Sequence, residues 1–507
     1  MQPVAAQPDL FRLLKQYWGY SEFRAKQQDI VENIMAGRDV AVIMPTGGGK
    51  SLCYQLPAVA MDRTCVVISP LIALMQDQVA QLGEAGISAA CINSSADFRT
   101  QTEVRMQAER GELRLLYLSP ERLLRDDTVA WLRRVPVGFF AIDEAHCISE
   151  WGHEFRPEYR QLRLLREAFP DKPIAAFTAS ATRQVRHDIV AQLKLEDAAK
   201  FVLSFHRPNL RYILRQCEPK EQPKLLRAAL RWYDEGNVIV YAPTVKLVES
   251  TAEELNRQGY AAVPYHGQME NRDRRANQEL WMSGEKRILV GTLAFGLGIN
   301  KPDVRAVLHL SLPKSLEQYY QEAGRAGRDG EPADCVVLWQ NKDVGLLTYF
   351  IQQMEDGEEK QRAWQRYRAI RQFAESQQCR HRQVCMHFGE TPKWERCDAC
   401  DVCGVELDWM SKSWRDDTPD APAVKAARRK LAKETAEVDP ELRQRLKEWR
   451  TGLAKEMGVP AYVILHDATL DSICRARPRS LAALMEVPGI GERKAGRFGE
   501  AILKIVD

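Results

Sequence analysis

The chain has 507 residues, of which 45% are hydrophobic and 28% are charged. At roughly 150 residues a domain, this length predicts three or four domains, and the composition excludes a wholly disordered chain. No apolar run approaches the about 20 residues that span a membrane, and the first ten residues lack the features of a secretory signal. A net charge of +3 neither requires nor excludes a polyanionic partner. We therefore expect a cytoplasmic protein with no membrane partner.

Short apolar runs alternate with longer amphipathic stretches in the first two thirds of the chain. The runs lack an in–out alternation, which is typical of strands buried on both faces of a parallel sheet. The rhythm breaks near residue 205 and restarts after Arg211, so we expect an α/β fold with two tandem parallel-sheet domains, 1–205 and 206–340. The runs are Val40–Met44, Cys65–Ser69, Leu113–Ser119, Gly138–Ile142 and Ile174–Phe177, then Val238–Tyr241, Ala261–Tyr265, Ile288–Gly291, Ala306–Leu310 and Cys335–Trp339.

The strand rhythm stops after Asn341. A helical, charge-dense segment containing a cysteine cluster is expected over 341–405. Residues 406–438 contain prolines, clustered aspartates and a basic run, which indicate a linker. Apolar residues recur at helical spacing over 439–507, which predicts a small all-α domain.

A glycine-rich segment follows the first predicted strand directly. The residues Thr46, Gly47, Gly48, Gly49, Lys50 and Ser51 are typical of a loop whose backbone N–H groups surround phosphate oxygens. Lys50 would reach the β- and γ-phosphates, and the Ser51 hydroxyl would hold Mg²⁺. Met44 stands where the consensus has glycine, and the alternative is an ordinary glycine-rich turn.

Two carboxylates, Asp143 and Glu144, follow a later strand of the same predicted sheet. A carboxylate at a strand end can hold Mg²⁺, and the one beside it can orient and deprotonate an attacking water. Alone, such a pair is usually a solvated loop. Together with the phosphate loop it makes ATP hydrolysis the working hypothesis.

An arginine pair flanked by glycines, Arg325 and Arg328, lies in the second predicted sheet domain. Guanidinium groups suit the charge that spreads over a transferring phosphoryl group. The alternative is a salt-bridged surface helix, which the glycines disfavour. If the pair completes the nucleotide site, ATP sits between the two domains and hydrolysis is coupled to domain closure, as in a motor.

Five of the twelve cysteines gather between Cys379 and Cys403. The spacing Cys397-x2-Cys400-x2-Cys403 offers three thiolates, and four thiolates suit a closed structural Zn²⁺ site. From chemistry alone Cys379, Cys385 and His387 compete for the fourth position, and an iron–sulfur role is the alternative. The other cysteines are interpreted as inert core residues: Cys53, Cys65, Cys91, Cys147, Cys217, Cys335 and Cys474.

These motifs stand in the order found in the RecQ family of DNA helicases, within helicase superfamily 2, which the chain resembles from about residue 10 to 405 and again in its C-terminal domain. The resemblance implies two RecA-like domains, 3′-to-5′ movement on DNA, and a role in recombination and repair. The segments that carry it are Tyr20–Gln27, Thr46–Ser51, Ser69–Leu71, Asp143–His146, Thr178–Thr182, Gly291–Lys301 and Gln321–Arg328.

The resemblance also assigns roles to residues. Tyr20 would stack on adenine while Arg24 and Gln27 read its edge; each has ordinary packing as its alternative. Arg328 resembles the family's arginine finger, Arg325 a second phosphate contact, and Cys379 the fourth zinc ligand. Thr292 and Gly296–Asn300 would line the interdomain cleft or the strand path.

An aromatic-rich segment, His146–Tyr159, follows the carboxylate pair immediately. Aromatic side chains with arginine can stack on unpaired bases, although core packing is the commoner use of such a loop. The segment resembles the loop through which RecQ helicases couple strand binding to ATP hydrolysis. The residues expected to bind DNA or relay its binding are His146, Trp151, His153, Phe155, Arg156, Thr178 and Thr182.

One feature departs from the family. RecQ chains commonly carry a winged-helix domain between the zinc site and the C-terminal domain, and the 35 or so residues here are too few for such a domain. The tail resembles the helicase-and-RNase-D C-terminal domain, in which Arg493, Lys494 and Arg497 could meet phosphates. A protein-interaction or spacing role is the alternative for this tail.

The sequence thus predicts an ATP- and Mg²⁺-dependent DNA helicase that acts as a monomer on single-stranded and on tailed or branched duplex DNA. It would be nucleoid-associated if bacterial, with single-strand-binding or recombination proteins as suggested partners. The rival hypotheses are a DNA-stimulated translocase without efficient unwinding, an RNA helicase, and a non-catalytic DNA-binding scaffold.

Overall fold

The computed structural model of the chain describes residues 8–92, 98–152, 154–195, 197–234, 236–292, 301–410, 439–457 and 461–507. It divides into two compact units. The first comprises the chain up to Ser204 together with Ala476–Asp507, and the second comprises Phe205–Arg475. No helix of the described residues is long and apolar enough to cross a membrane.

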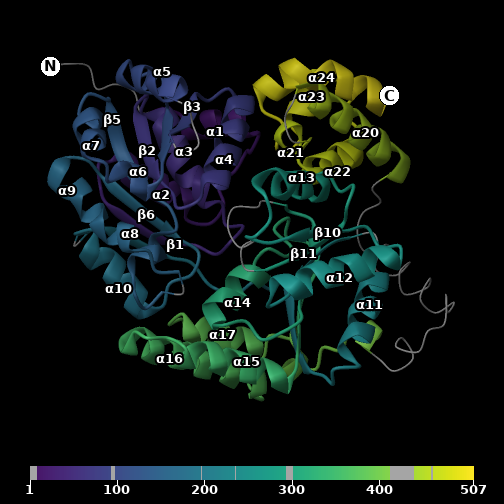
Figure 1. The fold of residues 1–507 in the computed structure, drawn as a ribbon. Coiled ribbons are helices and arrows are strands. Elements are labelled where there is room, and N and C mark those ends of the chain that lie inside the picture. Colours follow the sequence, from purple (N-terminus) through teal and green to yellow (C-terminus); the bar gives the residue numbers. More distant parts are fainter. Residues whose placement is uncertain are drawn as a thin grey trace. The chain divides into compact units, whose positions relative to one another are not determined.

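The first unit is built on a sheet with the strand order β3-β4-β2-β5-β6-β1-β7, in which every pairing is parallel. Figure 1 labels β1, β2, β3, β5 and β6 of this sheet. One face packs against α2, α3 and α4 through buried side chains such as Ile30, Tyr54 and Met75. The strands are β1 Val40–Ile43, β2 Thr64–Ile68, β3 Ala89–Ile92, β4 Leu115–Leu118, β5 Val137–Ile142, β6 Ile174–Thr178 and β7 Ala199–Val202.

Helices of the first unit connect these strands or follow them. They are α1 Leu10–Trp18, α2 Gln27–Met35, α3 Lys50–Ala60, α4 Ile72–Ala85, α5 Phe98–Glu109, α6 Pro120–Leu123, α7 Asp126–Leu132, η1 Ala145–Ile148, α8 Pro157–Arg160, η2 Gln161–Arg163, α9 Leu164–Ala168 and α10 Arg183–Gln192, with α23 Leu481–Met485 and α24 Glu492–Val506 from the C-terminal end.

The second unit contains a parallel sheet with the order β10-β11-β9-β12-β13-β8. Its core joins α11 and α12 to the sheet and includes Trp409 from beyond the cysteine cluster. The strands are β8 Leu210–Gln216, β9 Asn237–Tyr241, β10 Ala262–Tyr265, β11 Ile288–Gly291, β12 Val304–His309 and β13 Ala333–Trp339.

The cysteine cluster follows a group of helices in the second unit, and α15 packs against α16 (Figure 1). The helices of this unit are α11 Gln222–Trp232, α12 Val245–Arg257, α13 Asn271–Met282, α14 Leu316–Ala323, α15 Asn341–Gln352, α16 Gly357–Glu375, α17 Arg380–His387, η4 Asp401–Cys403, η5 Asp408–Met410, α20 Pro440–Met457, α21 Ala461–Ile464 and α22 Asp467–Ala476, whose last residue falls in the first unit.

The predicted α/β class and the two parallel sheets are confirmed. Each apolar run proposed as a strand overlaps a strand, but β3, β7 and β8 were missed. These three strands lie at sheet edges, where several residues of each strand are only partly buried, so they lack the long fully buried apolar runs of the central strands.

Candidate functional site

The phosphate loop turns from the end of β1 into the first residue of α3, Lys50. Gly47 and Gly49 have φ angles of 84° and 83°, in the left-handed region where only glycine is unstrained. The Lys50 ammonium donates to the Met44 carbonyl at 3.2 Å, so the Lys50 side chain turns back toward the start of the loop. The loop therefore has the backbone shape that phosphate binding at a helix N-terminus needs.

Gln27 and Arg24 hold this loop from the adjoining α2 region. The Gln27 amide nitrogen donates to the carbonyls of Gly48 and Gly49, each at 3.2 Å, and its oxygen accepts from the Arg24 N–H at 2.8 Å. The Arg24 guanidinium donates to the Gly47 carbonyl at 2.5 Å. Tyr20, assigned to adenine stacking, is 41% exposed. In this structure both residues expected to read adenine are hydrogen-bonded to the phosphate loop.

Asp143 follows the last residue of β5, and its side chain is buried. Burial and the neighbouring Glu144 raise the pKa of Asp143 to about 7, against the opposing effect of the Lys50 ammonium. Glu144 has a φ of 48°, a left-handed conformation that is unusual for a residue with a side chain. Strain of this kind is concentrated at functional sites.

A buried hydrogen-bonded relay leaves this carboxylate pair. The His146 ring nitrogen Nδ1 lies 2.9 Å from the Thr178 hydroxyl and 3.2 Å from a Glu144 carboxylate oxygen. Burial disfavours the charged imidazole, yet the pKa of His146 is raised because Cys147 and hydrogen bonds to Glu144 and Glu154 outweigh it. The Thr178 carbonyl in turn accepts from the Met44 N–H at 3.0 Å. The end of β6, the phosphate loop and the carboxylates thus form one connected unit.

The aromatic-rich segment begins beside this relay. Trp151 is 45% exposed, whereas the Arg156 side chain donates to the Pro70 carbonyl at 3.3 Å. The Phe155 ring lies 5.8 Å from the Arg160 guanidinium. Tyr159, which we did not include among the site residues, is buried and donates to the Asp143 carbonyl at 2.9 Å. This hydrogen bond joins the aromatic segment directly to the end of the strand that carries the carboxylates. The only signal for it in the sequence is that Tyr159 ends that segment.

Some of the predicted positions fall outside the described residues or have a structural role. His153 lies outside the described residues, as do Gly296–Asn300. Thr182 caps α10 by accepting from the Val185 N–H at 3.4 Å, which is a structural role. Thr292 is half-buried at the end of β11.

The arginine pair of the second unit lies in a turn after α14. Arg325 is buried, Arg328 is half-buried, and both lie close enough to Tyr241 to lower the pKa of its hydroxyl, although burial dominates and raises it. The backbone of the turn is fixed by Asn209, whose amide donates to the Gly327 carbonyl at 2.8 Å. The alternative reading, a salt-bridged surface helix, is therefore not what presents these guanidinium groups.

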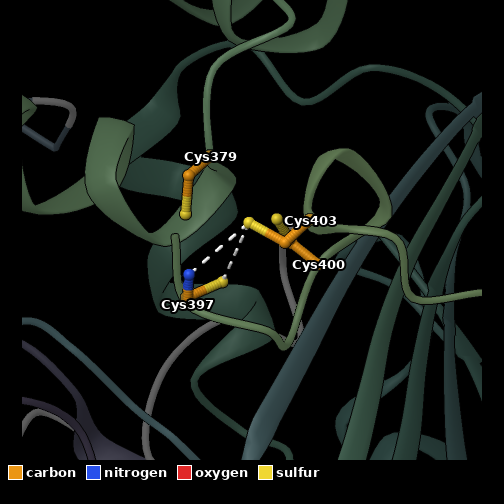
Figure 2. A group of neighbouring side chains, drawn as sticks. All are labelled: Cys379, Cys397, Cys400 and Cys403. Carbon is orange, nitrogen blue, oxygen red and sulfur yellow. Dashed lines mark hydrogen bonds between the residues drawn. The ribbon is translucent and has the colours of Figure 1, made fainter. Parts of the chain in front are cut away.

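The thiols of Cys379, Cys397, Cys400 and Cys403 converge, and all four sulfur atoms lie within 4.8 Å of one another (Figure 2). The sulfurs of Cys397 and Cys403 are 3.9 Å apart. Four ligands at the usual Zn–S distance of about 2.3 Å would stand about 3.8 Å apart in a tetrahedron, so the cluster fits one zinc ion. An iron–sulfur cluster would hold the same sulfurs further apart.

The fourth ligand position is resolved by this geometry. Cys385 is not part of the group, and His387 lies 2.7 Å from a Glu317 carboxylate oxygen. A hydrogen bond from Cys397 and backbone N–H groups lower the pKa of Cys400, whereas the same hydrogen bond together with burial raises the pKa of Cys397. The site suits zinc because thiolates bind it as anions.

The zinc cluster is fastened to the first strand of its own unit. Arg380, buried, forms a two-point ion pair with Asp401 at 2.9 and 3.0 Å, and the second Asp401 oxygen accepts from the Leu214 N–H at 3.3 Å. Tyr212 and Cys400 form an isolated β-bridge. No local sequence pattern predicts this attachment, because its partners lie far apart along the chain.

The basic residues of the C-terminal domain do not face open solvent uniformly. Arg497 forms an ion pair with Glu84 at 2.8 Å, and the Arg493 side chain contacts Gly86, both at the end of α4. Lys15 of α1 pairs with Glu486 at 2.7 Å. Phosphate binding by Arg497 would therefore compete with an existing carboxylate.

Comparison with known proteins agrees with this geometry. Family models match four stretches: DEAD/DEAH box helicase at residues 24–188, the helicase conserved C-terminal domain at 221–330, RecQ zinc-binding at 341–404 and the HRDC domain at 439–506. The chain is 32% identical to the ATP-dependent DNA helicase RecQ of Haemophilus influenzae, over 100% of this chain and 97% of that protein. The chain belongs to the RecQ family of ATP-dependent DNA helicases.

Other RecQ relatives support the same assignment. The Bacillus subtilis ATP-dependent DNA helicase RecQ is 32% identical over 97% of each chain. Among solved structures, a DUF1998 helicase, MrfA, bound to DNA matches with a TM-score of 0.55 at 18% identity, covering 67% of this chain and 52% of that one, which supports the fold alone. The four matched models include no winged-helix domain.

Proposed function

We propose that this RecQ-family enzyme moves 3′-to-5′ along one DNA strand, uses Mg²⁺ with ATP, and separates duplexes during recombination and repair. The observation that carries the proposal is the buried connection from the phosphate loop to the aromatic segment. Asp143 and Tyr159 share a hydrogen bond, and Glu144 reaches Thr178 through His146. A structural change at the phosphate loop would therefore alter the aromatic segment, and a change in the aromatic segment would alter the loop.

The proposed chemistry gives each of these side chains one role in ATP hydrolysis. Lys50 and the loop N–H groups bind the phosphates, and Ser51 with Asp143 supplies the hydroxyl and carboxylate oxygens that Mg²⁺ prefers. Mg²⁺ held by Ser51 and Asp143 would neutralise charge on the β- and γ-phosphates. Glu144 orients the attacking water and accepts its proton. Arg328 and Arg325 of the second sheet domain stabilise the charge on the transferring group.

Strand binding supplies the coupling. Trp151, exposed on the aromatic segment, stacks on unpaired bases, and the strained Glu144 changes its position with the His146 relay. We propose that DNA binding moves Glu144 into line with the γ-phosphate, so that hydrolysis accompanies translocation.

The test is unwinding of a 3′-tailed DNA duplex by the full chain with ATP and Mg²⁺, with ATP turnover measured in parallel on single-stranded DNA. Glu144→Gln is the control, because it keeps the size of the side chain and removes the base. Strand separation that requires Glu144 and fails on a 5′-tailed duplex supports the proposal. Separation of the 5′-tailed duplex alone contradicts the direction.

A second function has a specific observation in its favour. Only residues 405–438 separate the RecQ zinc-binding match from the HRDC match, so the chain lacks room for a winged helix. A translocase that displaces bound proteins without opening duplexes fits this shortened chain. Brisk DNA-stimulated ATP turnover without strand separation would favour it.

A further inference from the structure

An apolar cavity of about 240 Å³ opens on the first sheet. Its floor consists of Ala41 and Ile43 of β1 and Ala176 of β6, with Ile189 of α10 above them, and all four side chains are buried. These strand residues alternate with the ones that pack on α2, α3 and α4, so the cavity lies on the opposite face of the sheet.

The rim of the cavity is basic. Arg186, His187 and Lys200 line it, and none of the lining residues in the described part of the chain is acidic. The nearest carboxylate along α10, that of Asp188, accepts a hydrogen bond from the Ser149 hydroxyl at 2.6 Å and is thus engaged elsewhere. The rim therefore complements an occupant that carries a carboxylate beside an apolar group.

The strand beside the cavity, β7, is the outer strand of the sheet and pairs with β1 alone among the described strands. The N–H groups of Ala199 and Leu203 donate inward to Asp39 and Ile43, each at 2.9 Å. Because strand residues alternate, the backbone groups of Lys200 and Val202 point to the open edge. The Val202 side chain, 47% exposed, stands between that edge and the cavity.

We propose that this groove binds an extended segment of another protein. The segment adds a strand to β7, places one apolar side chain in the cavity, and sets a carboxylate two residues away against the basic rim. A spacing of two residues is required because alternate side chains of a strand lie on one face. Strand addition next to a helix-lined pocket is an established mode of peptide recognition.

The cavity also touches the ATPase. Thr178 lines it, and the Thr178 hydroxyl is the partner of His146 in the relay to Glu144. An occupant that presses on the end of β6 changes this contact. The docked segment therefore alters how strongly DNA stimulates ATP turnover, which gives a readout separate from binding.

The test uses a fluorescein-labelled peptide, Thr-Leu-Thr-Glu-Thr, whose leucine and glutamate share one face. Fluorescence anisotropy with the full chain is expected to show saturable binding below about 1 mM, which corresponds to about 4 kcal/mol. Two peptides, each N-methylated at one of two adjacent amides, should differ in affinity. Only the methyl group on the amide that faces β7 should weaken binding tenfold or more, because successive N–H groups point to opposite sides. A peptide with leucine and glutamate adjacent should bind at least tenfold more weakly.

Protein variants complete the test. Val202→Glu and Lys200→Glu should each weaken peptide binding tenfold or more while leaving ATP turnover without peptide unchanged, since neither residue belongs to the catalytic machinery. Absence of saturable binding up to about 1 mM, or equal affinity for all peptides and variants, overturns the proposal. Self-association of the chain that Val202→Glu abolishes would also overturn it, because a second copy would then occupy the edge.

Discussion

Replacing Gln27 by alanine tests whether this side chain holds the phosphate loop or reads the base. Gln27 is buried, and its amide makes hydrogen bonds to Gly48, Gly49 and Arg24. At about 1 kcal/mol each, these three bonds contribute about 3 kcal/mol to the loop conformation. That loss corresponds to a decrease in kcat/KM of about 100-fold.

The assay is DNA-stimulated hydrolysis of ATP and of GTP by the same variant. The loop contacts phosphates, which the two nucleotides share, so we expect kcat/KM to fall for both. Any additional reading of adenine by Gln27 would make the loss larger for ATP. Unchanged GTP turnover in Gln27→Ala would refute the loop-holding role.

The neighbouring Gln28 provides a matched control. Its amide donates to Glu32 at 2.8 Å on the surface of α2. Gln28→Ala should leave both nucleotides within about twofold of the unmodified chain, as is usual for surface substitutions. A comparable loss in this control would mean that α2, and not the Gln27 amide, was disturbed.

Four further outcomes are expected. Trp151→Ala should preserve basal ATPase but weaken its stimulation by single-stranded DNA, and equal loss of both would exclude the coupling role. Asp401→Ala should lower the free energy of unfolding of the second unit in urea by about 3 kcal/mol, because it leaves the charge of the buried Arg380 without its carboxylate partner. A change under about 1 kcal/mol would contradict the importance of this ion pair. Chelation of zinc from the unmodified chain, or the substitution Cys400→Ser, should lower the thermal midpoint of unfolding relative to the untreated, unmodified chain, and an unchanged midpoint would exclude a structural metal. Burial lowers the pKa of His381 to about 4, so the fold is most stable above pH 6.5, where the imidazole is neutral. Up to about 3 kcal/mol of the free energy of unfolding is lost as the pH falls from 6.5 toward 4. His381→Asn should flatten that part of the plot of stability against pH, and an unaltered plot would contradict the role of His381.

The candidate nucleotide site could be proposed from the sequence because its residues are local in sequence. Three glycines, a lysine and a serine in one run carry both the backbone shape and the ligands, and the Asp143–Glu144 pair adjoins a uniformly apolar strand. Sequence order then sufficed to bring the two together, since the carboxyl ends of parallel strands meet at one edge of the sheet.

What could not be predicted depends on pairings between distant residues. Tyr159 and Asp143, or Arg380 and Leu214 through Asp401, are brought together only by the fold. The edge strands were missed for a related reason: their residues are half-buried, so periodicity does not distinguish them from loops. The fourth cysteine ligand stayed open from chemistry alone because spacing does not reveal which thiol turns inward.

The contact between the cysteine cluster and β8 sets an order of events during synthesis. β8 is an outer strand, and residues 399–401 cover its free side through the Ala399 carbonyl, the Tyr212–Cys400 bridge and the Asp401 carboxylate. The ribosome makes β8 almost two hundred residues before that cover. A nascent chain therefore exposes an open strand edge until the cysteines emerge, and scarcity of zinc would prolong the interval in which chains can join edge to edge.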